Sequence, residues 1–122
     1  MTEKQAKMKA IREKMKALTE EQKQALLSHG LIPTIEGRYL SPRNTMICYL
    51  QAGMNGGKLP TVVGGYKQMK AAGRQVIKGE HGYTIIFPAM TKNDDGEEEA
   101  ERFMMATVFD ISQTEEMVLQ PA

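Results

Sequence analysis

The chain has 122 residues, enough for one domain with a modest core and too few for two ordinary domains. Its 16 Lys and Arg nearly balance its 15 Asp and Glu, which excludes a strongly acidic mimic of DNA. Apolar runs are short, and the Lys-rich N-terminus lacks the apolar block of a signal peptide. We therefore expect a soluble cytoplasmic protein with no membrane partner.

Charge is distributed unevenly along the chain. Seven Lys and Arg against four Glu give residues 1–30 a net charge of +3, and seven against two give residues 31–90 a charge of +5. Two cations against nine carboxylates leave residues 91–122 at −7. The basic middle segment suits a phosphate-bearing partner, although ordinary solvated faces would give the same distribution.

Two helices are predicted at the N-terminus, in residues 1–30. From Glu3 to about Leu18 an apolar residue recurs every three or four positions among Lys and Glu. The stripe comprises Met8, Ile11, Met15 and Leu18. Thr19 and Gln22 then form a capping box for a second helix that ends before Gly30. This helical arm either packs on the rest of the chain or pairs with a second copy, which leaves a homodimer open.

A third helix is predicted from Ser41-Pro42 to Met54. Ser offers its oxygen to free backbone amides, and Pro at the first helical position loses nothing by lacking an N–H. Arg43 and Asn44 fall in the first turn, where the partly positive helix end favours anions. The glycine-rich loop that follows places Lys58 on the surface.

A fourth, short helix spans residues 65–72 and directs Lys67 and Lys70 outward. Strands are then expected at 74–77, 83–87 and 103–109, with a turn at 78–82. Pro88 is expected to end the second strand, and residues 91–101 form a polar, acidic excursion.

These elements predict an α+β fold. The three strands form a small, mainly antiparallel sheet, covered on one face by helices 42–54 and 65–72 and preceded by the helical arm. We divide the chain into the arm (1–30), one domain (31–117) and a tail (118–122).

Several chemistries are excluded. Cys48 is the single cysteine and lies among apolar residues, so we expect a buried thiol and no disulfide. His29 and His81 stand in unrelated elements without metal-ligand spacing, and Gly57-Lys58 is followed by Leu59 and not by the Ser or Thr of a P-loop. We therefore expect no metal, no cofactor and no catalytic residues, hence no enzyme.

After these exclusions, the binding of another molecule is the function that the residues support. Proteins that bind single strands combine cations along the backbone with flat rings on which bases stack. The candidate nucleic-acid-binding residues are Arg38, Tyr39, Arg43, Asn44, Lys58, Tyr66, Lys67, Lys70, Arg74, Lys78, His81 and Tyr83. Each tyrosine has a half-buried structural role as its alternative, and His81 has that of a solvated loop residue.

Three blocks in order carry a family resemblance. They are Ser41-Pro42-Arg43-Asn44, the stretch from Thr61 to Glu80, and Val108 to Glu115. Over about Tyr39 to Met117 the chain resembles the N-terminal domain of the ArdC antirestriction family, a single-stranded-DNA-binding domain found on plasmids, phages and integrative elements. The resemblance implies an α+β fold and single-stranded DNA as the partner. Tryptophans common in that family are missing here, and the metalloprotease-like part of full-length ArdC has no counterpart, so no proteolytic role carries over.

A protein-interaction or antirestriction module is the alternative function. It would act through the acidic segment 94–101 or through the helical arm. DNA and RNA are not distinguished by these residues.

Overall fold

Two antiparallel sheets and the helices around them make up the part of the chain that the computed structural model describes, residues 2–54, 56–92, 95–96 and 98–118. The helices are α1 (Glu3–Ala17), α2 (Glu20–Leu27), α3 (Pro42–Met54), α4 (Tyr66–Ala71) and the 3-10 turn η1 (Ile111–Gln113). The strands are β1 (Val63–Gly64), β2 (Arg74–Val76), β3 (Tyr83–Lys92), β4 (Glu98–Asp110) and β5 (Thr114–Glu116). The predicted α+β class is confirmed.

Local capping starts the N-terminal helices where the sequence predicts. The Thr19 hydroxyl accepts from the Gln22 amide (3.1 Å), while the Gln22 side chain accepts from the Thr19 amide (2.8 Å). Ser41 Oγ accepts from the Asn44 amide (3.1 Å) at the start of α3. The predicted capping box and the predicted start of α3 are both confirmed.

The main sheet differs from the expected one in one strand. Its order is β1-β4-β3, with Val63 opposite Asp110 in one pair and Tyr83 opposite Val108 in the other. The expected strand at 74–77 is present as β2, but it pairs with β5 in a separate two-stranded sheet. The prediction that this strand joins the main sheet was wrong. Its partner β5 is a short polar segment, Thr-Glu-Glu, without an apolar strand pattern, so the sequence did not reveal it as a strand.

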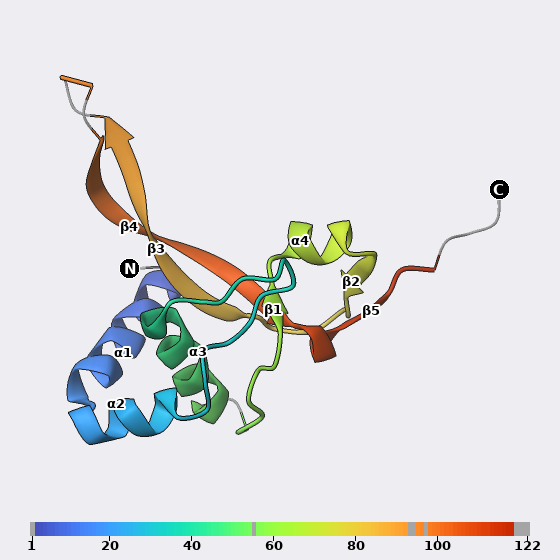
Figure 1. Ribbon diagram of the computed structural model, residues 1–122, viewed down its shortest axis with the longest axis horizontal. Coiled ribbons are helices and arrows are strands. Elements are labelled where there is room, and N and C mark those ends of the chain that lie inside the picture. The colour runs from blue at the N-terminus through green and yellow to red at the C-terminus, as the bar shows by residue number, and fades with distance from the viewer. Residues whose placement is uncertain (1, 55, 93–94, 97, 119–122) are drawn as a thin grey trace.

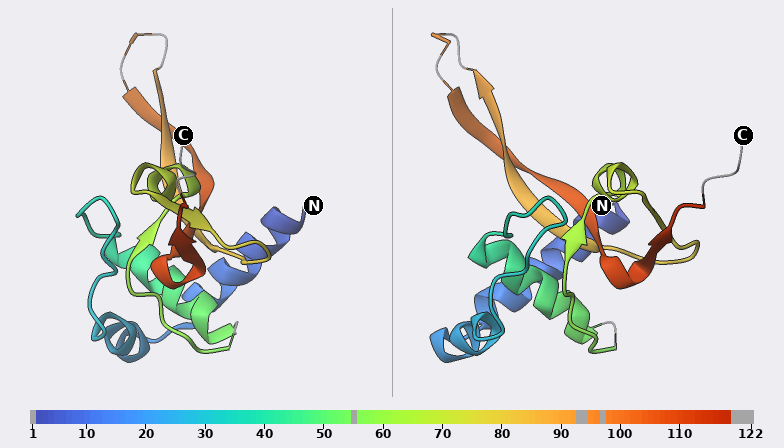
Figure 2. Two further views of the ribbon diagram at one scale, coloured as in Figure 1. Left: turned by 90° about the vertical axis from the view of Figure 1, so that its right-hand side faces the viewer. Right: turned by 45° about the vertical axis from the view of Figure 1, so that its right-hand side comes forward.

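The β3–β4 hairpin is longer than expected. Pro88 does not end β3; it lies opposite Phe103, and pairing continues to Lys92 and Glu98 across a bulge at Ala89/Met90. A proline is accommodated because β3 is an edge strand, where a missing N–H need not break a ladder. The outer half of the hairpin extends past the helices (Figures 1 and 2). Asp94 and Glu97 of the expected acidic excursion lie outside the described residues.

Side-chain amides of α3 cover part of the free edge of β3, the edge that does not pair with β4. Asn44 donates to the Ile86 oxygen (2.8 Å) and accepts from the Ile86 amide (3.0 Å). Gln51, which is buried, makes the same two bonds with Thr84 (2.7 and 2.8 Å). The two amides act as a substitute strand, so this part of the edge is not open to pairing with another chain.

The helical arm packs on the rest of the same chain. Met8 and Ile11, 5% and 1% exposed, form a cluster with Ile47 of α3 and Ile86 of β3. Of the two alternatives for the apolar stripe, packing within one chain is the one observed. Covering by a second copy would first require the arm to leave α3.

A second cluster joins α3 to the sheet on the other side. It comprises Ile32, Leu40, Cys48, Tyr49, Val63 and Val108. Cys48 has no exposed surface, and burial raises the pKa of its thiol to about 12. The prediction of a buried cysteine is confirmed.

Candidate nucleic-acid interface

Two tyrosine rings are exposed beside cations. Tyr39, in the loop before α3, is 67% exposed, and Tyr66, at the start of α4, is 59% exposed. Arg38 precedes the first ring in the chain and Lys67 follows the second, and both cations are exposed. An open ring next to a cation offers a base a stacking surface and offers the adjoining phosphate a positive charge.

The Tyr39 loop and α4 meet at Gly64. The amide of Ile35, in this loop, donates to the Val63 oxygen (2.8 Å), which fixes the loop on β1. A Cβ on Gly64 would lie 2.7 Å from Ile35 Cγ2 and 3.4 Å from Met69 Cε of α4. A larger residue would therefore displace the loop or crowd the helix, and glycine allows both to pack at the same point of β1.

The α4 helix, which carries Lys67, presents one further cation, Lys70, between two well-defined ends. Gln68 Oε1 accepts from the Gly65 amide (2.7 Å) at its start, and Gly73 ends it with a φ of 77°. Lys67 and Lys70 are exposed on the two turns between these residues. Arg38, Lys67 and Lys70 are thus exposed cations within four residues of the two exposed tyrosines.

Arg74 belongs to the framework between the two short strands. Its Nε donates to Thr114 Oγ1 (2.7 Å) and its Nη2 to the Thr114 oxygen (3.2 Å), and the residue is half-buried. Lys78 lies exposed in the turn that follows β2. Of these two predicted cations, Lys78 is the more accessible to a ligand.

Arg43 lies away from α4. It lines a groove of about 250 Å³ together with Arg12, Lys16 and Lys23 of α1 and α2, above Ile11 and its apolar neighbours. The start of α3 lies beside α1 and the hairpin, whereas α4 packs against β2 (Figures 1 and 2). Arg43 and the cations of α4 therefore belong to two separate basic areas.

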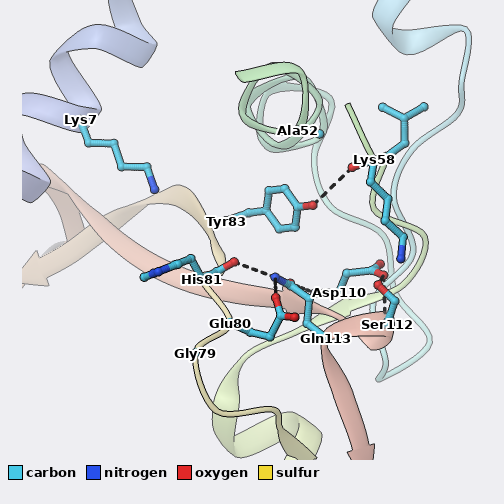
Figure 3. Close-up of a pocket in the computed structure, with 11 residues that line it drawn as sticks. Lys7, Ala52, Lys58, Gly79, Glu80, His81, Tyr83, Asp110, Ser112 and Gln113 are labelled. Carbon is cyan, nitrogen blue, oxygen red and sulfur yellow. Dashed lines mark hydrogen bonds between the residues drawn. The ribbon is translucent and has the colours of Figure 1, made fainter. Parts of the chain in front are cut away.

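A third basic area surrounds a hollow of about 570 Å³. Lys7 of α1 and Lys58 of the loop after α3 approach it from opposite sides, with the Tyr83 ring between them (Figure 3). The turn before β3 and the η1 turn also line it, among others with Glu80, His81 and Gln113. The structure thus brings Lys58, His81 and Tyr83 of the predicted set together in one place.

Asp110 forms the floor of this hollow and is nearly inaccessible at 2% exposure. Its Oδ1 accepts from the amides of Thr61 (2.5 Å) and Val62 (3.1 Å) and from the Thr61 hydroxyl, and its Oδ2 accepts from Ser112. Burial alone would raise the pKa of Asp110, but the hydrogen bonds from Ser112, Thr61 and Val62 outweigh it, so the net pKa is lowered. The charged Asp110 side chain thus has both its oxygens engaged in hydrogen bonds within the protein.

Gln113 links Asp110 to the turn at Glu80 and His81 by hydrogen bonds. Its Nε2 donates to the His81 oxygen (2.7 Å) and to Glu80 Oε2 (3.1 Å), and its Oε1 accepts from the Asp110 amide (2.8 Å). Much of the Val108–Glu115 block that carries the family resemblance therefore holds segments together.

Sequence reasoning missed Lys7, Glu80 and Gln113 as members of the hollow. Lys7 follows the ordinary Lys/Glu pattern of an amphipathic helix, and no local signal marks it. Glu80 and Gln113 lie within the recognised blocks, yet their juxtaposition depends on the return of β4. Asn44, a predicted contact, has its amide engaged by Ile86, as described above.

The described residues also permit two negative findings. None of their helices combines the length and apolar character needed to cross a bilayer. No group of three or more of their His, Cys, Asp and Glu side chains is arranged to hold a metal ion.

The fold is that of a small α+β protein with exposed basic and aromatic residues. The family model for the N-terminal domain of anti-restriction factor ArdC matches residues 2–113, and the chain belongs to this family. The match begins well before Tyr39, so the family similarity includes the two N-terminal helices, contrary to expectation. The sequence pattern of these two helices is common to many amphipathic helices, so it did not mark them as part of the family. The packing of α1 on α3 joins them to the rest of the chain.

Solved structures agree with this fold. The metal-free crystal structure of the antirestriction ArdC protein from the R388 plasmid is 23% identical, with a TM-score of 0.56, over 76% of this chain and 35% of that one. The Mn(II)-bound structure of the same protein gives 21% identity and a TM-score of 0.58, over 77% and 34%. The chain thus spans about a third of the ArdC length. No curated protein matches it.

Proposed function

We propose that this chain is a sequence-nonspecific single-stranded-DNA-binding module of a mobile genetic element or a phage-type protein. The observation that carries the proposal is the pair of exposed rings, Tyr39 and Tyr66, on elements that meet at Gly64, each beside an exposed cation. Bases of a single strand stack on such rings without regard to sequence, and the cations follow the phosphates.

The proposed contact surface is a subset of the residues named from the sequence. Its central residues are Arg38, Tyr39, Tyr66, Lys67 and Lys70, with Lys58, Lys78 and His81 as exposed flanking residues. Asn44 and Arg74 are left out because their side chains bond to the protein itself. Membership in the ArdC N-terminal family supports an association with DNA.

Fluorescence anisotropy with single-stranded DNA, duplex DNA and RNA of equal length tests this function. We expect the DNA single strand to bind best and its affinity to fall steeply with salt, because phosphate contacts release counterions. The double variant Lys67→Ala/Lys70→Ala should flatten the slope of log affinity against log salt by about 0.7 for each phosphate that the protein no longer neutralises.

Lys23→Ala is the matched control for this test, since Lys23 is already paired with Glu20 (3.4 Å). It should leave the salt slope unchanged. Equal affinity for duplex DNA, or affinity that is indifferent to salt, contradicts the proposal.

Removing either ring separates stacking from charge. Tyr39→Ala and Tyr66→Ala should each weaken single-strand binding by about 1–3 kcal/mol while the salt slope stays constant, since every cation is retained. Tyr49→Phe is a control that alters a buried tyrosine, 6% exposed, outside the surface. A flatter salt slope in the Tyr variants, or undiminished affinity, would argue against stacking at these rings.

A protein-interaction or antirestriction module is the second candidate. The groove between α1, α2 and Arg43 favours it, because it sets four cations around an apolar floor on the helical arm. A partner would then need acidic and apolar groups together. A pull-down that persists in high salt after nuclease treatment, and that fails with Arg12→Glu/Lys16→Glu, would favour this function over the first.

A further inference from the structure

We propose that the hollow between Lys7 and Lys58 holds one unstacked base of the bound strand, and that it prefers a base with an exocyclic amino group. The inference rests on the proposed single-strand binding and adds a site and a base preference to it. A single inserted base changes affinity with composition and does not require a sequence motif.

The hollow has the size and the wall that a base requires. Its volume of about 570 Å³ is within the range of small-molecule sites and exceeds what one base needs. The Tyr83 ring lies in it, half-buried, with its hydroxyl 3.5 Å from the Lys58 oxygen (Figure 3). Burial raises the pKa of Tyr83. The ring is thus an uncharged flat wall against which a base can stack.

Glu80 offers an available carboxylate acceptor in the hollow. Asp110 uses both its oxygens to bind Thr61, Val62 and Ser112. Glu80 takes one bond, from Gln113 to Oε2, among the described residues, and a carboxylate has about four acceptor positions. Glu80 therefore has unused acceptor capacity at the rim, held in place by Gln113.

A carboxylate distinguishes bases by their exocyclic group. The amino group of cytosine or adenine donates to it, whereas the corresponding group of thymine is a carbonyl oxygen that repels it. Lys7 and Lys58, on opposite sides of the hollow, form no ion pair with a described carboxylate, and they are placed for the phosphates before and after the inserted base (Figure 3).

The test compares oligo-dC with oligo-dT of equal length by anisotropy at constant salt. Both are pyrimidine strands, so base size is matched. The wild-type protein should bind oligo-dC about tenfold more tightly, the lower range for one good base contact. Glu80→Gln retains an acceptor for Gln113 but adds a donor, so the preference for oligo-dC should disappear or reverse.

Glu115→Gln is the matched control, because Glu115 accepts from Gln75 Nε2 (2.9 Å) in the same way outside the hollow. It should keep the wild-type preference. Equal binding of both strands by the wild type, or an unchanged preference in Glu80→Gln, overturns base capture and leaves single-strand binding intact. Failure to bind either strand removes the proposed function and this inference with it. The comparison of oligo-dC with oligo-dT on the wild-type protein tests the inference even if Glu80→Gln does not fold.

Discussion

Replacing Asp110 with Asn should lower the free energy of unfolding by about 3 kcal/mol, because an amide cannot accept on both sides. One oxygen of Asp110 serves Thr61 and Val62, and the other serves Ser112. Whichever way the Asn amide is turned, its NH₂ faces a backbone N–H. Urea unfolding followed by circular dichroism measures the difference.

The loss of stability in Asp110→Asn should also depend on pH. Because the pKa of Asp110 is lowered from its ordinary 3.8, the charged form is favoured in the folded state. Its contribution is complete above that value and is lost as the pH falls through the folded-state pKa. The gap between wild type and Asp110→Asn should thus be full at neutral pH and shrink below about pH 4. Glu116→Gln, an exposed carboxylate of β5, should show neither effect.

Ile11→Ala should destabilise the protein by about 2–5 kcal/mol, the usual cost of truncating a buried aliphatic side chain. Ile11 is 1% exposed between Ile47 of α3 and Ile86 of β3. The truncation leaves a cavity at the contact that holds the helical arm to the sheet. A thermal melt should show a lower midpoint.

The dependence of that midpoint on protein concentration separates the two uses of the arm. If the arm packs within one chain, the midpoint of the parent and of Ile11→Ala should not change with concentration. A midpoint that rises with concentration would indicate that the arm pairs with a second copy. Lys9→Ala, on the exposed face of the same helix, controls for helix propensity. A variant Ile11→Ala as stable as the parent would contradict the packing of the arm.

The last of the three blocks that identify the family, Val108 to Glu115, contains none of the residues proposed to bind DNA. Asp110, Gln113 and Thr114 join β4 to the loop before β1, to the turn at 80–81 and to Arg74. Such bonds maintain a backbone arrangement, and they leave the ligand to side chains such as Tyr39 and Lys67. This block therefore identifies the family while it says little about which surface binds.

The sequence by itself determined the elements whose causes are local. The Thr19–Gln22 capping box, the Ser41 cap and the glycine end of α4 involve residues within a few positions of one another, and all stand where the pattern predicts. The buried thiol of Cys48 and the α+β class followed from apolar patterning in the same way.

Only the tertiary structure decided which distant segments meet. β2 pairs with the polar β5 because the chain returns there after β4, and a strand pattern does not name its partner. Asn44 reaches Ile86 because α3 lies along the edge of β3. Lys7 and Lys58 join Glu80 and Tyr83 around one hollow from three separate segments. These contacts arise from the packing of whole elements against the core, which no short stretch of residues encodes.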